Sequence, residues 1–316
     1  MALELSNCAA TAAPAPGPRD GNEVSGDARK ILIIANPTAG GFRAAVLDRI
    51  AAALRGDGRA VELHLTSRAG EIGEICSNPN LAVDIVVVAG GDGSVNEALT
   101  GFEAIVAPPA LAVVPFGTAN VLACELSLPR RADAIARMIL RRRTRPLHYG
   151  TANGRPFVLM ASCGFDAEVV HAVPLKLKRR LGKAAYVLSA FKVVVGRPRR
   201  DIAVEIDGET LRCRLAVVAN SSHYGGPFVL CPQAGATREG LHLIALMNDS
   251  FPALVRVGIA LLRGRLSRAR DVVMRPVTHA VLRADEPVAA QIDGDPFGTT
   301  PIEVAPAARA LTIIVP

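Results

Sequence analysis

A glycine-rich loop around Asp92 carries the clearest chemical signal in the sequence. The residues Gly90-Gly91-Asp92-Gly93-Ser94 follow the apolar run Ile85–Ala89 and precede a helical pattern over residues 94–101. Glycines let the backbone approach phosphate groups closely, and the start of the following helix offers N–H groups to an anion. A carboxylate at Asp92 would lie beside those phosphates and act through Mg²⁺. The pattern predicts a phosphate-binding loop, with a ligand-free strand-to-helix turn as the alternative.

Two further polar loops close apolar runs of the same kind. Asn36-Pro37-Thr38-Ala39-Gly40-Gly41 follows Ile31–Ala35, and Pro115-Phe116-Gly117-Thr118-Ala119-Asn120 follows Leu111–Val114. Parallel strands present their carboxyl ends at one edge of a sheet, where ligands bind. We therefore expect the three loops to line one crevice. Thr118 and Asn120 either bond a nucleotide or cap the next helix, and the sequence favours neither.

Two common nucleotide motifs are absent from these loops. A dinucleotide fingerprint needs a third glycine where Asn96 stands, and no G-x-x-x-x-G-K-[ST] run exists, since Gly182-Lys183 is followed by Ala184. The phosphate chemistry predicted here therefore belongs to neither of those classes.

A second acidic motif, Asp293-Gly294-Asp295, lies about two hundred residues further along the chain. A carboxylate in this motif can accept the proton of an alcohol during phosphoryl transfer. The same letters are also typical of a tight hairpin turn. Asp207-Gly208-Glu209 resembles the motif equally well, and we interpret it as a hairpin because it lies between two strand patterns.

The elements that must position these residues divide the chain into regions. Residues 1–28 are rich in Ala, Pro, Gly and Asp and are expected to be a disordered tail. Apolar strands alternate with helical patterns over 29–146, which predicts an α/β domain with a doubly wound parallel sheet. Strand patterns dominate 147–300, which predicts a second, β-rich, mainly antiparallel domain. Its expected strands are 157–161, 202–206, 212–219, 242–247, 272–275, 280–283 and 289–292, with helices at 176–195 and 252–266.

Charge and composition favour a peripheral membrane protein of the cytoplasm. Residues 130–200 hold 17 Lys/Arg and 3 Asp/Glu, within a chain of net charge +7. Such a block suits an anionic membrane surface, although an ordinary solvated arginine-rich face is equally compatible. No apolar run reaches the length of a membrane span, no signal peptide is evident, and the cysteines are scattered. We expect attachment to the inner face of the membrane, and a homodimer is compatible with the sequence.

The ordered set of motifs resembles the diacylglycerol kinase catalytic family, which includes bacterial lipid kinases and sphingosine kinases. The likeness runs from about residue 30 to the end of the chain. The matching stretches are Asn36-Pro37-x-x-Gly40, Gly90–Glu97, Gly117-Thr118-x-Asn120-x-x-Ala123, Gly164–Val169, Gly182–Tyr186, Asn220-x-x-x-Tyr224-Gly225-Gly226 and Asp293-Gly294-Asp295. Each stretch alone is modest support, whereas all seven in family order are specific.

This resemblance implies an ATP- and Mg²⁺-dependent kinase that phosphorylates a lipid hydroxyl in a cleft between the two domains. It implies that Asp293 is the general base, that Asp295 is its acidic partner and that Asp92 belongs to the Mg²⁺ site. It also implies that residues 301–316 return to the first domain. The implied ATP-binding residues are Asn36, Pro37, Thr38, Gly40, Gly90, Gly91, Asp92, Gly93, Ser94, Glu97, Gly117, Thr118 and Asn120.

The chain departs from the family pattern at four places. Ser94 replaces the usual Thr. Val121 replaces the Asp of many diacylglycerol-type members, and sphingosine kinases also tend to lack an acidic residue at this position. Arg238-Glu239 replaces an acidic pair associated with a secondary metal site, and Asp295 replaces the commoner Glu. These changes put the secondary metal and part of the Mg²⁺ network in doubt.

Three alternatives remain open at this point. An NAD kinase-like enzyme shares the G-G-D-G loop, although Asn96-Glu97 and the Gly117–Asn120 motif disfavour it. A non-catalytic nucleotide- or lipid-binding relative is compatible with Val121. Nucleic-acid binding is disfavoured because aromatics are only 4% of the chain and no recognition motif is present.

Overall fold

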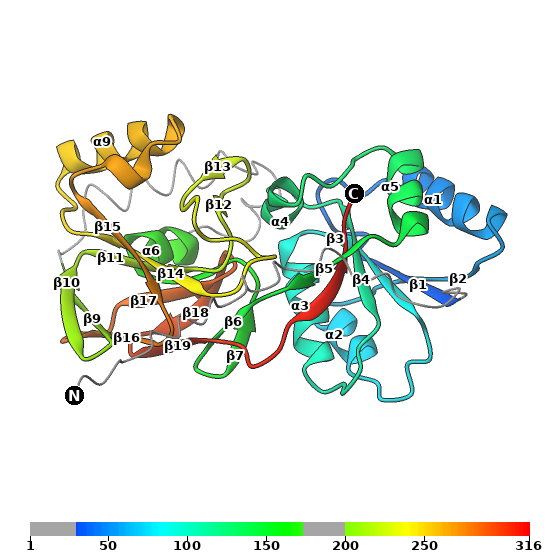
Figure 1. The fold of residues 1–316 in the computed structure, drawn as a ribbon, viewed down its shortest axis with the longest axis horizontal. Helices are drawn as coiled ribbons and strands as arrows, with labels where there is room; N and C mark the ends of the chain where they lie inside the picture. The colour runs from blue at the N-terminus through cyan, green and yellow to red at the C-terminus, as the bar shows by residue number, and fades with distance from the viewer. Residues whose placement is uncertain (1–29, 173–199) are drawn as a thin grey trace, which may run out of the picture.

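The first domain is built on a six-stranded sheet in the computed structural model, which describes residues 30–172 and 200–316 (Figure 1). Its strands lie in the order β2 (Ala60–Leu65), β1 (Lys30–Ala35), β3 (Ile85–Gly90), β4 (Ala110–Pro115), β20 (Leu311–Ile314) and β5 (Thr144–Leu147). All neighbours are parallel except β20 and β5. Strands β1, β3 and β4 are almost wholly buried, which explains their unbroken apolar runs.

Helices cover both faces of this sheet, as the doubly wound prediction requires. Helix α1 (Ala44–Gly56) packs with α5 (Ala132–Arg141), and α2 (Glu71–Cys76) packs with α3 (Asp92–Phe102), on opposite sides in Figure 1. The short helix α4 (Val121–Glu125) follows β4 at the side of the domain nearest the second domain. The predicted α/β fold class of the first domain is confirmed.

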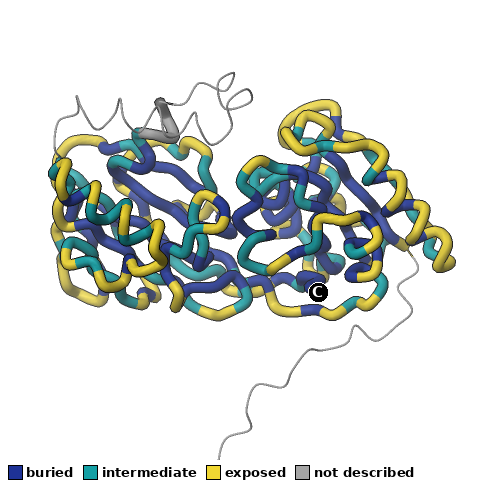
Figure 2. The backbone as a smooth tube through the Cα atoms, turned by 90° about the horizontal axis from the view of Figure 1, so that it is seen from above, coloured by how far each residue is buried: buried dark blue, intermediate teal, exposed yellow. Residues whose placement is uncertain are grey.

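The second domain consists mainly of two antiparallel sheets packed around one core, which confirms the prediction of a β-rich domain. Buried side chains such as Phe157, Ile202 and Leu243 fill the space between the sheets. Figure 2 shows the buried strands of both domains beneath more exposed helices and loops. One sheet has the order β10 (Glu209–Cys213), β9 (Ile202–Ile206), β16 (Ala280–Ala284), β19 (Ile302–Pro306), β6 (Gly150–Ala152) and β7 (Arg155–Phe157). The other has the order β15 (Val272–Val277), β14 (Leu241–Leu246), β11 (Leu215–Ala219), β8 (Met160–Gly164), β17 (Ala289–Ile292) and β18 (Asp295–Thr299).

Smaller elements complete the second domain. The hairpin of β12 (His223–Tyr224) and β13 (Phe228–Val229) lies between α4 and α9 (Phe251–Leu262). Helix α6 (Phe165–Ala172) follows β8, and a single 3₁₀ turn spans Leu266–Arg268. Among the described residues, no helix has the length and apolarity that a membrane span requires.

The chain crosses between the domains near both ends of the second domain. After β5 it enters the second domain at β6, and it stays there through β19, a few residues past the predicted limit at 300. Strand β20 then inserts between β4 and β5 of the first sheet. The first domain therefore contains a strand from the far end of the sequence.

Two predicted strands are wrong in their extent. Residues 157–161 divide between β7 and β8, and residues 212–219 divide between β10 and β11, which belong to different sheets. In both cases the apolar pattern continues while the chain changes sheet, so periodicity alone cannot locate the break. The expected tail over 1–28 and the expected helix over 176–195 lie outside the described residues.

Candidate active site

The three polar loops that follow β1, β3 and β4 form one connected surface. The Gly41 N–H donates to the Phe116 carbonyl at 2.7 Å, and the Gly117 N–H donates to the Gly90 carbonyl at 3.1 Å. The loops are held together by their own backbone, because the strands that carry them are neighbours in the parallel sheet. The expected convergence of the three loops is therefore present.

Glycine is required where two of these loops touch. A Cβ atom on Gly117 would lie 2.5 Å from the Cα atom of Gly91 and 2.6 Å from the Asn120 Oδ1 atom. A Cβ atom on Gly90 would collide with the buried Ser94 side chain. Neither backbone nor a buried side chain can move away cheaply, so the glycines allow the close approach that the loop geometry needs.

Asp92 does not point into open space but binds the start of α4. Its two carboxylate oxygens accept the N–H groups of Val121 at 2.9 Å and Leu122 at 3.1 Å. Burial raises the pKa of Asp92 above its ordinary value, while these backbone donors oppose the rise. The carboxylate caps a helix that no side chain of its own caps, so Asp92 ties the glycine-rich loop to α4.

Asn120 does not cap the helix that follows it, which was one of the two roles expected of it. It adopts a left-handed conformation with φ of 50°, and its amide donates to the Gly117 carbonyl at 2.7 Å. Its side chain does not cap α4, because Asp92 already supplies that cap. Asn120 therefore shapes the loop after β4 from within.

The other predicted nucleotide residues occupy different parts of the loop surface. Asn36 accepts the N–H and hydroxyl of Thr38 in a tight local turn. A Cβ atom on Gly40 would lie 3.2 Å from Thr118 Oγ1, so the loops after β1 and β4 adjoin there. Pro37, Thr38, Gly40 and Thr118 are exposed. Glu97 lies where α3 meets α2, and its carbonyl oxygen would be 3.1 Å from a Cβ atom placed on Gly73.

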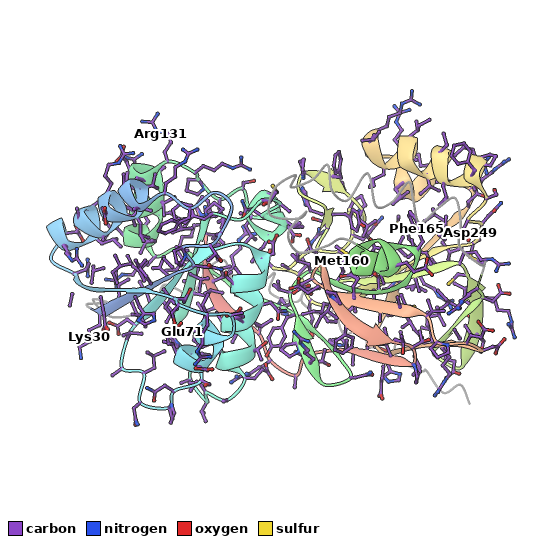
Figure 3. All side chains as sticks on the ribbon, turned by 180° about the vertical axis from the view of Figure 1, so that it is seen from behind. Lys30, Glu71, Arg131, Met160, Phe165 and Asp249 are labelled. Carbon is purple, nitrogen blue, oxygen red and sulfur yellow. The ribbon has the colours of Figure 1, made fainter. Side chains whose placement is uncertain are left out.

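Asp293 lies at the junction of the two domains, where its carboxylate is fully engaged. One oxygen accepts the N–H of Leu159 at 2.8 Å and of Met160 at 3.0 Å. The other accepts the N–H of Val158 at 2.8 Å and the Asn96 amide at 2.8 Å. Figure 3 shows Met160 on the side of the second domain that faces the first. Burial raises the pKa of Asp293 to about 6, although all four donors favour the ionised form.

Asp295 has a different setting two residues later. It begins β18, it is exposed, and its Oδ2 atom would lie 3.6 Å from a Cβ atom placed on Gly93. Gly93 belongs to the first turn of α3, within the predicted phosphate loop. The structure therefore brings the acidic turn of the second domain against the glycine-rich loop of the first, with the Asp295 carboxylate at the surface.

Asn96 is a site residue that the candidate list drawn from the sequence omitted. This buried amide of α3 donates to the Pro156 carbonyl at 3.1 Å and to Asp293, so it links the two domains directly. Asn96 could have been identified from the sequence by its position one helical turn after Asp92, on the same side of the helix. A polar residue there indicates a partner across the helix face.

A buried polar network supports the acidic turn from the second domain. The Gln291 amide donates to Ser162 Oγ at 2.7 Å and to Asp166 Oδ2 at 3.0 Å, and its carbonyl accepts the Gly294 N–H at 2.8 Å. Tyr224 donates its hydroxyl to the other oxygen of Asp166. Because Gln291 touches both the network and the turn, the network fixes the backbone between Asp293 and Asp295.

The donor chemistry of the site suits Mg²⁺ carried on a polyphosphate. Over the described residues, no group of three or more His, Cys, Asp or Glu side chains is arranged to hold a metal ion alone. Mg²⁺ usually needs only one or two carboxylates, because phosphates and waters complete its coordination. Asp92 and Asp295 offer carboxylate oxygens near the first turn of α3. The residues present therefore fit a Mg²⁺–nucleotide complex.

Comparison with known families divides the chain close to the junction of the two domains, although the first match includes β6 of the second domain and the second match includes β20 of the first. Residues 30–152 match the model of the diacylglycerol kinase catalytic domain, and residues 160–315 match the YegS C-terminal NAD kinase beta sandwich-like domain. The two matches follow one another along nearly the whole described chain.

Individual relatives are similar over most of their length. The chain is 28% identical to a diacylglycerol kinase of Bacillus subtilis (strain 168), over 91% of this chain and 97% of that protein. It is 29% identical to a protein of Pseudomonas aeruginosa (strain UCBPP-PA14) named "Probable lipid kinase YegS-like", over 92% and 95%. A crystal structure of a candidate diacylglycerol kinase from Bacillus anthracis str. Sterne has the same fold, with a TM-score of 0.80 and 23% identity over 93% of this chain and 98% of that chain.

Proposed function

Because the chain belongs to the diacylglycerol kinase catalytic-domain family of lipid kinases, we propose that it transfers the γ-phosphoryl group of Mg-ATP to a hydroxyl group of a diacylglycerol-type or sphingoid-type lipid. The observation that carries this proposal is the contact between the acidic turn and the glycine-rich loop. Asp295 lies beside Gly93, and Asp293 accepts the Asn96 amide at 2.8 Å. A base from one domain thus adjoins a phosphate-binding loop from the other.

Exposure to solvent distinguishes the roles of the two acidic residues. We assign the general base to Asp295, because its carboxylate is exposed beside the phosphate loop. The sequence prediction gave that role to Asp293, whose two oxygens already accept four donors. An alcohol proton would have to displace one of these donors. Asp293 is better suited to position the turn that carries Asp295.

The transfer step needs little covalent participation from the protein. The lipid hydroxyl oxygen forms a bond to the γ-phosphorus, and the bond from that phosphorus to the bridging oxygen of ADP breaks. The hydroxyl proton passes to the Asp295 carboxylate. Backbone N–H groups at the start of α3 and the close-packed glycine loops orient the phosphates. Most of the rate enhancement then comes from alignment and charge stabilisation.

Mg²⁺, when bound, would neutralise charge on the transferred phosphoryl group. Asp92 is the residue suited to hold it, from behind the glycine-rich loop, which leaves Asp295 to accept the proton. Because both oxygens of Asp92 accept backbone N–H groups, we assign Asp92 an indirect role through water. Val121 supplies no oxygen beside it and is buried.

A transfer assay on the purified chain tests the proposal. We expect Mg-ATP and mixed micelles of single lipid alcohols to give a phosphorylated lipid, identified by mass spectrometry. Asp295→Asn should lower kcat at least 100-fold while ATP affinity stays within a few-fold, because a positioned base contributes about 10²–10⁴. Asp285→Asn, an exposed carboxylate of the second domain, is the matched control.

The same assay separates the alternative functions. Transfer to NAD with no transfer to any lipid would identify an NAD kinase-like enzyme and overturn the proposal. ATP binding without turnover on any substrate would indicate a non-catalytic relative. We place the working enzyme at the cytoplasmic face of a membrane, because one proposed substrate is a membrane lipid and the other, ATP, is a cytoplasmic metabolite.

A further inference from the structure

Helix α9 presents a stripe of large apolar side chains to the surface. Phe251, Val255, Ile259 and Leu262 are exposed to 63%, 43%, 42% and 69%, and they recur at intervals of four, four and three residues. Such spacing places them along one face of a helix. Within α9, only Ala253 is buried. On the other side of the helix, Val257, Ala260 and Leu261 pack against the hydrophobic core, so α9 carries this exposed apolar stripe in addition to the apolar side that it buries.

The arginines beside this stripe line a cavity. Between Phe251 and Arg270 the sequence contains arginines and no acidic residue. A cavity of about 500 Å³ is lined by Arg256, Ile259, Ala260, Arg263, Arg265, Arg268 and Ala269. Arg256 is already paired with Asp271 at 2.7 Å, whereas Arg263, Arg265 and Arg268 are exposed. Guanidinium groups are well suited to bind phosphate oxygens in pairs, so the cavity matches a phosphate group.

From these two features we infer that α9 and the arginines after it form a docking surface for an anionic phospholipid bilayer. The apolar stripe would enter the boundary between headgroups and acyl chains, and the arginine cavity would take a lipid phosphate. Charge favours a bilayer over a purely apolar partner, because three exposed arginines lie beside the stripe. A nucleic-acid backbone, in turn, offers no apolar surface that would cover the exposed side chains of Phe251 and Leu262.

The position of α9 suits this role. It stands at the outer edge of the second domain in Figure 1, and it packs against β13. Strand β13 pairs with β12, which contacts α4 next to the glycine-rich loop. Docking through α9 would therefore bring a bilayer to the domain junction. The inference rests on the proposed function only in supposing that the substrate lies in that bilayer.

Vesicle binding tests the docking surface without reference to catalysis. We expect the purified chain to sediment with vesicles of phosphatidylcholine and phosphatidylglycerol, and much less with phosphatidylcholine alone. The triple change Arg263→Gln, Arg265→Gln and Arg268→Gln should weaken binding about 100-fold, since each arginine near an anionic surface contributes a factor of about five. Phe251→Ser with Leu262→Ser should weaken binding to the same vesicles by at least tenfold.

Matched controls come from the first domain and from an exposed loop. Arg43→Gln, Arg49→Gln and Arg55→Gln remove three exposed arginines, and Val106→Ser removes an apolar side chain that is 97% exposed. The controls should bind vesicles like the wild type. Equal losses in both triple variants, or full binding by both α9 variants, would overturn the inference. So would conversion of a dimer to a monomer by the α9 variants with vesicle binding unchanged.

Transfer to a lipid alcohol in detergent micelles separates this inference from the kinase proposal. The α9 variants should keep wild-type transfer there, because micelles deliver substrate without docking. Vesicle binding through α9 with no transfer to any lipid would leave the docking surface standing and overturn the kinase. Transfer in micelles together with vesicle binding that does not depend on α9 would support the kinase and overturn the docking surface.

Discussion

Two aspartates of one turn have unlike surroundings, and this difference determines what each can do. Asp293 accepts four hydrogen bonds at the domain junction, while Asp295 is exposed beside Gly93. The sequence predicted the turn and its acidic character. The family resemblance implied Asp293 as the general base, whereas we propose Asp295, because Asp293 accepts donors from residues 158–160, more than 130 positions earlier. Roles within a short motif depend on long-range contacts that local letters do not encode.

The raised pKa of Asp293 predicts a pH-dependent contribution to stability. Burial raises this pKa to about 6 in the folded chain, whereas an unfolded aspartate titrates near about 3.9. A group with a higher folded pKa stabilises the fold below its unfolded pKa, and this contribution is lost as pH rises through the folded pKa. The free energy of unfolding of the wild type should therefore decline between about pH 4 and pH 6 more than that of Asp293→Asn.

Chemical denaturation of both proteins at a series of pH values measures this difference. Asp293→Asn should also be less stable than the wild type near pH 7, by about 1–3 kcal/mol, because an amide group cannot accept all of the backbone donors. Parallel pH profiles for the two proteins would contradict the assignment. Asp285→Asn again serves as the control for removal of an exposed charge.

At the scale of the element, the glycine loops show what an apolar pattern can predict. Unbroken runs such as Ile85–Ala89 indicate buried parallel strands, and parallel strands bring their following loops together. The two-residue strands β12 and β13 escaped prediction, because so short a run carries no periodicity. The capping of α4 by Asp92 also escaped, since it joins two loops that are separated in sequence.

The backbone contact between the loops predicts a strict requirement for glycine at residue 117. Gly117→Ala would place a methyl group 2.5 Å from the Gly91 Cα atom, and neither backbone can yield without separating the loops. We expect ATP affinity, measured by calorimetry, to fall at least tenfold while the protein stays folded. Gly56→Ala is the control, because its Cβ atom would meet nothing within 4 Å. Unchanged affinity in Gly117→Ala would show that these loops do not hold the nucleotide.

Helix α4 connects the glycine-rich loop to the second domain. Asp92 caps its start, and Glu125 at its end accepts the Ser222 N–H at 2.8 Å and the Ala236 N–H at 2.5 Å. Glu125→Gln turns an acceptor into a donor against these N–H groups, so it should lower stability by about 1–3 kcal/mol and also lower kcat. Thermal unfolding and the transfer assay measure both effects, with the exposed Glu62→Gln as control. Loss of stability alone would confine α4 to a structural role.

At the scale of the whole molecule, we expect the two domains to unfold as one cooperative unit. The chain crosses the junction twice, and Asp293, Asn96 and Glu125 each bond across it. Calorimetric unfolding should therefore show a single transition with equal calorimetric and van't Hoff enthalpies. Two separate transitions would mean that the junction is too weak to hold the site residues in register.

The insertion of β20 between β4 and β5 also has a consequence for biosynthesis. A ribosome extends the chain from its N-terminus, so the strand that completes the first sheet emerges only after every strand of the second domain. Until then, the apolar edge of β4 is an open template for pairing with other chains. The nascent first domain therefore lacks one strand of its sheet, and is prone to aggregation, while the second domain is being translated. The first sheet can be completed only after translation has passed residue 314.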